Sequence, residues 1–248
     1  MDRTKGMART ATSSQPIYQR VRDHFVSQID QGVLRPHSKL PSERTLSETL
    51  KISRTTARQA FIQLEGEGFI YRSDRRGWFV APPRLHYNLS GAFSFFSSVI
   101  TEGGTPGAEV LSRETGTPPR WIRERLGLEP KEKVHKTRRL RLISGEPAMV
   151  EESFHPARRF PGFHDHDMHG SFFDVLAKDY GVHPHHHEIS LRLVELDDED
   201  ARLLVQKSGS AGVLVTQVVF DADAQPFSVD SLTWRGDIAE FTVSGRVE

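Results

Sequence analysis

The sequence contains no cysteine among its 248 residues. This absence excludes disulfide bonds, thiolate catalysis and zinc sites built on cysteine. No stretch approaches the roughly 18 consecutive apolar residues that a membrane-spanning helix requires, and the N-terminal residues lack the apolar centre of a secretory signal. We therefore expect a cytoplasmic protein with no membrane partner.

Several patterns that mark catalytic sites are also missing. The chain carries no Gly-x-Ser-x-Gly elbow, no glycine-rich phosphate loop and no zinc-protease helix motif. These patterns position a nucleophile, a nucleotide or a catalytic metal. We expect a protein that is not an enzyme and that uses no cofactor.

Charge is divided unevenly along the chain, although its formal net charge is zero. Residues 1–84 hold 15 Lys and Arg against 8 Asp and Glu, whereas residues 85–248 hold 18 against 25. A basic segment binds a polyanion favourably because neutralised phosphates release their condensed counterions. The asymmetry favours nucleic-acid binding by the first part of the chain.

The N-terminal part has the pattern of a small helical domain. Residues 1–14 are polar and basic and are predicted to form a flexible arm. Apolar residues at four-residue intervals, from Ile17 to Ile29, predict a first helix, and Ser42 and Ser53 are suitable N-caps for a second and a third. The β-prone runs 69–72 and 78–80 predict a hairpin. Together they predict a winged helix-turn-helix over residues 15–81, followed by a linker over residues 82–92.

The third helix is suited to reading DNA. Its predicted buried face leaves Arg54, Thr55 and Arg58 on other faces, near the end that reaches base edges in helix-turn-helix proteins. Basic residues at the tip of the hairpin suit a groove or phosphate contact. The predicted DNA-binding residues are Arg44, Ser53, Arg54, Thr55, Thr56, Arg58, Arg75, Arg76 and Gly77.

Three separated blocks carry a family resemblance. Residues 40–44 (LPSER), 53–60 (SRTTARQA) and 76–80 (RGWFV) resemble the GntR-type winged helix in composition and spacing. The resemblance implies a homodimer that binds a near-palindromic operator. Two positions depart from the family pattern: Lys51 stands where a turn glycine is usual, and Trp78 replaces a small polar residue.

The remainder of the chain, residues 93–248, alternates predicted strands and helices. Strands are predicted near 108–113, 134–143, 147–155, 187–196, 212–221 and 226–234, and helices near 92–102, 118–126, 171–180 and 198–206. Turns between successive strands predict hairpins. We expect an α+β domain built on an antiparallel sheet.

Two arginines share one face of the strand predicted at 134–143. Arg139 and Arg141 alternate with Leu140 and therefore point to the same side. A three-residue loop at 144–146 would place Arg139 opposite Glu151, whereas a two-residue loop would reverse the parity. Two close arginines repel unless a negative charge lies between them, which predicts either an anionic ligand or an ion pair with Glu151.

This second domain is similar to the UTRA effector domain of the HutC subgroup. The segments that carry the similarity are 103–106, 139–141, 145–151, 170–173 and 235–237. The resemblance implies a chorismate-lyase-like α+β fold that binds a small effector. It implies the effector-binding residues Arg139, Arg141, Glu151, Ser171, Phe173, Asp230 and Trp234. Ser228 stands where an acid is frequent, so the effector can differ from the amino-sugar phosphates that some relatives bind.

Histidines at 164, 166, 169, 183 and 185–187 raise an alternative, because neutral imidazoles bind zinc or nickel. Consecutive histidines on a strand point to opposite faces and do not converge, so we expect no metal site. The predicted function is therefore a transcriptional repressor whose operator binding is controlled by a small, anionic metabolite. A metal-responsive regulator and a lyase-like enzyme are the alternatives.

Overall fold

The computed structural model describes residues 15–73, 76–82, 84–91 and 94–244. The chain divides into two compact units, Met1–Pro83 and Arg84–Glu248, and each is described by itself. The arm predicted at residues 1–14 lies outside the described residues.

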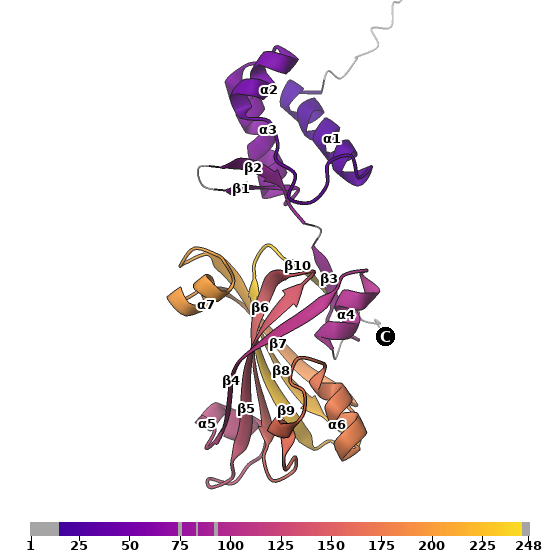
Figure 1. Cartoon of the computed structure of the whole chain (residues 1–248), viewed down its shortest axis with the longest axis vertical. Helices are drawn as coiled ribbons and strands as arrows, with labels where there is room; N and C mark the ends of the chain where they lie inside the picture. The colour runs from indigo at the N-terminus through magenta and orange to yellow at the C-terminus, as the bar shows by residue number, and fades with distance from the viewer. Residues whose placement is uncertain (1–14, 74–75, 83, 92–93, 245–248) are drawn as a thin grey trace, which may run out of the picture. The chain divides into compact units, whose positions relative to one another are not determined.

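The first unit is the predicted winged helix-turn-helix (Figure 1). Its core is a single cluster in which the buried face of the third helix supplies Ala57, Ala60, Phe61 and Leu64. The two hairpin strands pair antiparallel, with Ser73 opposite Gly77. The elements are α1 (Ile17–Asp30), α2 (Glu43–Leu50), α3 (Arg54–Gly66), β1 (Ile70–Ser73) and β2 (Gly77–Val80).

Side-chain caps fix the ends of α2 and α3. The Ser42 hydroxyl accepts a hydrogen bond from the Thr45 amide, and the Ser53 hydroxyl accepts one from the Thr56 amide at 3.0 Å. Lys51 ends α2 in the left-handed conformation, with a φ of 52°. Lysine therefore takes the turn conformation for which the family uses glycine, at the steric cost of a side chain at positive φ.

Trp78 is a core residue of this unit and not a surface residue of the wing. It is buried, packs against Phe61 with ring centroids 5.5 Å apart, and donates its indole hydrogen bond to Glu43 Oε1 at 3.2 Å. The tryptophan thus ties the wing to α2 and α3.

The second unit is built on a six-stranded sheet in which neighbouring strands run antiparallel, in the order β4-β5-β6-β9-β8-β7. This confirms the predicted α+β class, and the strand predicted at 134–143 has those bounds. The sheet strands are β4 (Pro106–Gly116), β5 (Val134–Ile143), β6 (Glu146–Pro156), β7 (His186–Glu195), β8 (Ala211–Phe220) and β9 (Pro226–Arg235).

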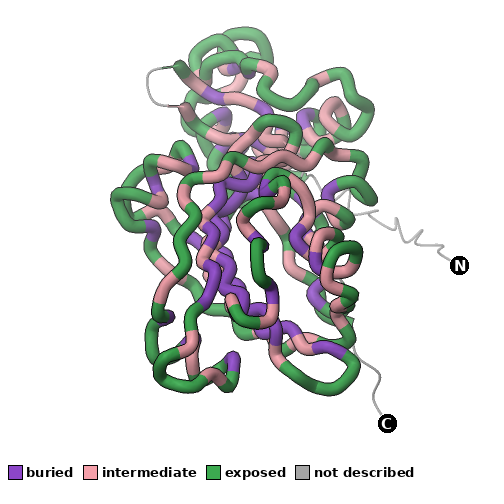
Figure 2. Tube along the Cα trace, turned by 60° about the horizontal axis from the view of Figure 1, so that its bottom comes forward, coloured by how far each residue is buried: buried purple, intermediate pink, exposed green. Residues whose placement is uncertain are grey.

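Helices cover both faces of the sheet (Figure 1). On one face α4 (Phe95–Thr101) and α6 (Phe172–Tyr180) pack in two apolar clusters, near the short helix η1 (Phe163–Asp165). On the other face α5 (Arg120–Arg125) and α7 (Asp198–Leu203) pack in two more. Buried residues gather along the strands between these layers (Figure 2).

The linker predicted at 82–92 is partly wrong, because part of it belongs to the fold of the second unit. β3 (Leu85–Asn88) pairs in parallel with β10 (Ala239–Thr242). Leu85, Tyr87 and Leu89 are buried in the cluster that also holds Phe95. The alternation of buried and exposed residues in β3 is the pattern of a strand with one face on a core.

The β5–β6 hairpin has the predicted pairing but not the predicted loop. Ser144 and Gly145 form a two-residue turn, both with positive φ, between the paired residues Ile143 and Glu146. With this turn alone, each residue of β5 would pair one position away from its predicted partner in β6. An extra residue in β6, Ala148, forms a bulge that shifts the register by one. The bulge therefore restores the predicted pairing and places Arg139 opposite Glu151.

Candidate functional site

The N-terminal end of α3 presents polar side chains to solvent. Arg54, Thr55 and Arg58 are exposed. Ser53 and Thr56 are joined by a hydroxyl contact of 2.8 Å in addition to the cap. Those two residues therefore fix the start of the helix, whereas the arginines are free to reach a ligand.

The other predicted DNA-contacting residues lie on α2 and the wing. Arg44 is exposed and pairs with Glu48 one turn later at 3.0 Å. Arg76 is exposed and donates to the Ser73 hydroxyl, and Gly77 has a φ of 105°, where a side chain would be strained. Arg75 lies outside the described residues.

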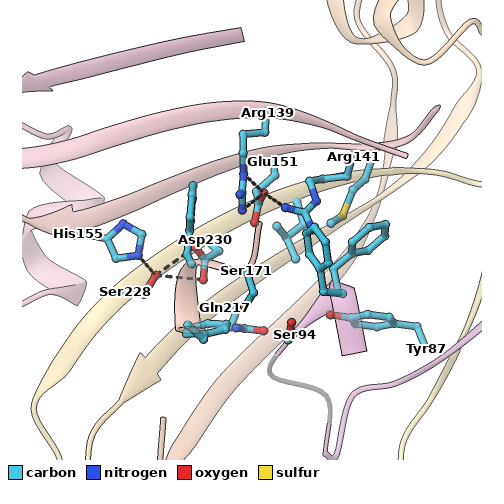
Figure 3. Close-up of a pocket in the computed structure, with 16 residues that line it drawn as sticks. Tyr87, Ser94, Arg139, Arg141, Glu151, His155, Ser171, Gln217, Ser228 and Asp230 are labelled. Carbon is cyan, nitrogen blue, oxygen red and sulfur yellow. Dashed lines mark hydrogen bonds and ion pairs between the residues drawn. The ribbon is translucent and has the colours of Figure 1, made fainter. Parts of the chain in front are cut away.

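The second unit contains a pocket between the sheet and the helices α4 and α6 (Figure 3). The space among its lining atoms, together with the open solvent at its mouth, is about 460 Å³. Six predicted residues line it, namely Arg139, Arg141, Glu151, Ser171, Phe173 and Asp230. Ser171 also accepts the capping hydrogen bond at the start of α6.

Arg139 is held by partners within the protein. Its Nε and Nη2 lie 2.7 and 2.6 Å from Glu151 Oε2, and its Nη1 donates to the carbonyls of Met168 and Gly170 at 2.9 and 2.8 Å. The guanidinium also lies 3.3 Å from the centroid of the Phe172 ring. Of the two predicted alternatives for this arginine, the structure has the ion pair with Glu151.

Arg141 is as buried as Arg139, but two of its guanidinium nitrogens lack hydrogen-bond partners. Its Nη1 lies 3.5 Å from Glu151 Oε2, and neither Nη1 nor Nε has a hydrogen-bond partner. The guanidinium packs between the rings of Phe95 and Phe96, each 4.6 Å away. Burial lowers the pKa of Arg141 to about 10, so it remains a cation at neutral pH. A buried cation with two nitrogens that lack acceptors is costly, and an anion beside those nitrogens would lower the cost.

The carboxyl groups in the pocket differ in ionisation. Burial raises the pKa of Glu151, but Arg139 and Arg141 outweigh this effect, and the pKa lies below its usual value. Burial and the charge of Glu151 raise the pKa of Asp230 to about 7. The Ser228 hydroxyl lies between Asp230, at 3.1 Å, and His155 Nε2, at 3.2 Å (Figure 3). Asp230 can therefore supply a proton donor or an acceptor near neutral pH.

Asp230 should make stability depend on pH, and the Asp230→Asn variant should remove that dependence. The unfolded chain releases this proton near pH 4 whereas the folded chain holds it to about 7, so stability is lost as pH rises through this window. The variant should melt at least about 4 °C above the wild type at pH 8 and show a smaller difference at pH 4.5. Calorimetry at both pH values measures this, and parallel pH profiles of the two proteins would contradict the assignment.

Trp234 is corrected from a pocket residue to a core residue. It is fully buried among Tyr87, Phe95 and Phe241 and does not line the pocket. Its indole nitrogen has no hydrogen-bond partner. The ring lies on the same side of the sheet as Arg141, because Met149 pairs with both residues.

Several lining residues were missed by sequence analysis. Gln217 pairs with Asp230 across β8 and β9, and strand parity alone could have indicated it. Tyr87 and Ser94 come from a segment without a motif, so no sequence signal identified them. The missed residues are Tyr87, Ser94, Phe95, Phe96, His155, Phe172, Gln217 and Leu232, whereas Ser228, which the sequence singled out, and Met149, on the face of Arg139, also line the pocket.

Comparison with known protein families matches both units. The UTRA domain matches residues 101–240, and the gntR family of bacterial regulatory proteins matches residues 17–80. The chain is a gntR-family regulator with a UTRA domain. The resemblance found in the sequence is thereby confirmed.

Curated relatives of this regulator extend over nearly the whole chain. It is 28% identical to the HTH-type transcriptional repressor NagR of Bacillus subtilis, with 90% of this chain and 91% of NagR covered. It is 25% identical to the mannosyl-D-glycerate transport/metabolism system repressor MngR of Escherichia coli, with 87% and 92% covered. The chain is thus a DNA-binding transcriptional regulator. Its family and these relatives are regulators and not enzymes.

Solved structures share the fold of the regulator. The crystal structure of PhnF from Mycobacterium smegmatis is 23% identical, has a TM-score of 0.68, and is matched over 92% of this chain and 100% of that one. The match supports the two-part architecture of a helix-turn-helix unit and an antiparallel-sheet unit.

The histidines of the regulator are distributed among separate contacts. His164 contacts the Thr137 hydroxyl, His166 lies 3.5 Å from Asp179, and His169 pairs with Asp167. Among the described residues, no three metal-ligating side chains converge on one point. Within the same residues, no helix is both long and apolar enough to cross a membrane. Neither the comparisons nor these contacts support the metal-responsive alternative.

Proposed function

We propose that this regulator is a repressor that leaves its operator when a small anionic metabolite binds beside Arg141. The observation that supports the proposal is the buried guanidinium of Arg141, which has two nitrogens without hydrogen-bond acceptors and faces the pocket. A carboxylate or phosphoryl oxygen would supply the missing acceptors through charge-assisted hydrogen bonds.

The surroundings of Arg141 favour an anion over a neutral ligand. Glu151 already neutralises Arg139, so the second arginine leaves the site with an excess positive charge when Asp230 is protonated. Ser171 lies at the start of α6, where the helix dipole also attracts negative charge. The name of the relative MngR includes mannosyl-D-glycerate, which carries a carboxylate. These features make Arg139, Arg141, Glu151, Ser171, Phe173 and Asp230 the proposed effector site.

A ligand screen tests this proposal. The thermal stability of the full chain is measured with inorganic phosphate, a sugar phosphate, an alkylphosphonate and a sugar carboxylate, each beside a neutral sugar as control. A ligand that binds only the folded state raises the melting temperature by mass action. We expect at least one anion to stabilise the protein and to release it from operator DNA. Stabilisation by neutral sugars alone would contradict an anionic effector.

On the DNA side, the proposed contacts are the predicted ones: Arg44, Ser53, Arg54, Thr55, Thr56, Arg58, Arg75, Arg76 and Gly77. The exposure of the α3 arginines supports base contacts, and Ser53 and Thr56 act through the helix start. A homodimer would place two recognition helices on the half-sites of a near-palindromic operator. Such a protein acts in the compartment that holds the DNA, which in a bacterium is the cytoplasm.

Replacing Arg54 by alanine should weaken operator binding by about 1–3 kcal/mol, or roughly tenfold to a hundredfold, and relax the preference at one base. The operator is first selected from a random DNA pool, and affinity is then measured by fluorescence anisotropy at fixed salt. Arg20→Ala is the matched control, because Arg20 is an exposed arginine of α1. Equal losses in both variants, with base preference unchanged, would mean that Arg54 contributes only charge.

A further inference from the structure

The outer edge of the six-stranded sheet is a long strand, β7, and no strand among the described residues pairs with its outer side. β7 is the last strand in the sheet order and pairs on one side only, with β8, over all of its residues. The pairing contains no register shift, and the strand contains no proline. Long, regular edges attract another strand, and proteins protect them with bulges, proline or charged side chains. β7 has only the last of these, in Glu188, Arg192 and Glu195.

The opposite edge of the same sheet has this protection. β4 begins at Pro106 and is interrupted by a bulge between Val110 and Ser112. β7 in contrast exposes apolar side chains, with Leu193 83% and Leu191 44% exposed. The two edges therefore differ in their proline and their bulge, and β7 is the edge whose backbone is suited to accept a partner.

The backbone of β7 limits how a partner strand can pair. The Leu196 amide donates to the Ser210 carbonyl in continuation of the β7–β8 register. In an antiparallel ladder, alternate residues bond to the same neighbour. The even-numbered residues of β7 therefore bond to β8, and odd-numbered residues such as Ile189 and Leu191 turn their backbone groups outward. Two antiparallel copies of β7 must then pair even with even and odd with odd.

Several registers pair even-numbered residues with even-numbered ones, and the charged side chains favour one of them. When the two-fold axis passes through Ser190, Glu188 of each copy lies opposite Arg192 of the other. An axis at residue 192 would place Arg192 against itself, and axes at residues 189 and 191 bring no acid opposite an arginine. Even-numbered pairs are the non-hydrogen-bonded ones, in which side chains lie closest, so the Ser190 register forms two ion pairs at short range.

We propose that two copies of this chain pair through β7 in the register centred on Ser190, joining their sheets across the two-fold axis. The inference rests on the homodimer of the proposed function and identifies its interface in the effector unit. Glu188 and Arg192 set the register on one face of the sheet, and Leu191 and Leu193 become covered on the other. The sheet that carries the effector pocket is then continuous with that of the second copy.

Charge reversal tests the register in the full chain. Sedimentation velocity should give twice the 28.1 kDa chain mass for the wild type. Arg192→Glu and Glu188→Arg, each of which places like charges opposite each other, should each raise the dimer dissociation constant by at least tenfold. The double variant should restore it. Both side chains are exposed, so the variants should fold.

A disulfide test uses the absence of native cysteine. Ser190→Cys introduces a single thiol at the proposed axis, where the close pair suits a disulfide, and mild oxidation should convert the protein to a covalent dimer. Ser208→Cys, at an exposed loop position, is the control and should remain monomeric on a non-reducing gel. A wild-type dimer that survives both charge reversals and gives no Ser190 crosslink would overturn the β7 interface and leave the homodimer standing. A wild-type monomer would overturn both.

Discussion

Replacing Arg139 by alanine should destabilise the effector unit by about 3–5 kcal/mol, because removing one partner of a buried ion pair leaves the other charge unpaired. Glu151 would remain buried beside the sheet without its two short contacts to Arg139. The carbonyls of Met168 and Gly170 would lose their donor as well. A loss of this size is a large fraction of the 5–15 kcal/mol that stabilises a typical domain.

The measurement must report on the effector unit, because two units need not unfold together. Hydrogen exchange of peptides from β5 and β6 in the full chain supplies that report. The matched control is the double variant Arg139→Met with Glu151→Met, which removes both charges and should recover part of the loss. If Arg139→Ala exchanges as slowly as the wild type, Arg139 is not a structural residue and its ion pair contributes little.

Periodicity and capping predicted most of the elements of both units. The bounds of β5 agree with its predicted range, and Ser42, Ser53 and Ser171 cap the helices expected to follow them. These signals are local: a cap or an alternating face depends on residues a few positions apart. They locate elements reliably wherever the packed face of an element is visible in its own sequence.

β3 and β10 were missed because their stability comes from distant parts of the chain. Leu85 pairs with Ala239, and the two strands are only four residues each. The prolines before β3 suggested a linker, and nothing in that segment indicates its partner. The Ala148 bulge was missed as well. A two-residue turn followed by a bulge and a three-residue loop place the same residues opposite each other near Arg139, so the sequence pattern does not distinguish them.

The different roles of Arg139 and Arg141 could not be read from the sequence. Strand parity placed both on the pocket face, which is confirmed. What separates them is the path of the chain before α6, which brings the carbonyls of Met168 and Gly170 to Arg139 and none to Arg141. That path depends on the packing of Phe163 and Met168 in the core, which involves residues from five elements or more.

Replacing Arg141 by alanine should abolish the response to the anionic effector and leave operator binding by the free protein unchanged. The loss of charged hydrogen bonds should weaken the effector by about 1.5–3 kcal/mol, or roughly tenfold to more than a hundredfold. Stability should fall less than in Arg139→Ala, because Glu151 keeps Arg139 as its partner. Arg141 gives up only the 3.5 Å contact with Glu151 and the packing against two phenylalanine rings, and it has no hydrogen bond from Nε or Nη1 to lose. The variant should therefore repress permanently, since an effector shifts the DNA-binding equilibrium only by its differential affinity for the two states.

Arg138→Ala is the matched control for this variant. Arg138 is the same residue type on the same strand, but it pairs with Glu199 and Asp200, away from the pocket. The control should keep the response to the anion found in the ligand screen. Calorimetric titration of that anion and operator anisotropy are measured on both variants. If Arg141→Ala binds the anion as tightly as Arg138→Ala does, the anion does not pair with Arg141. If instead the melting temperature and operator affinity of Arg141→Ala fall together, Arg141 is a structural residue like Arg139, because only the loss of a required internal partner would disturb the ligand-free protein.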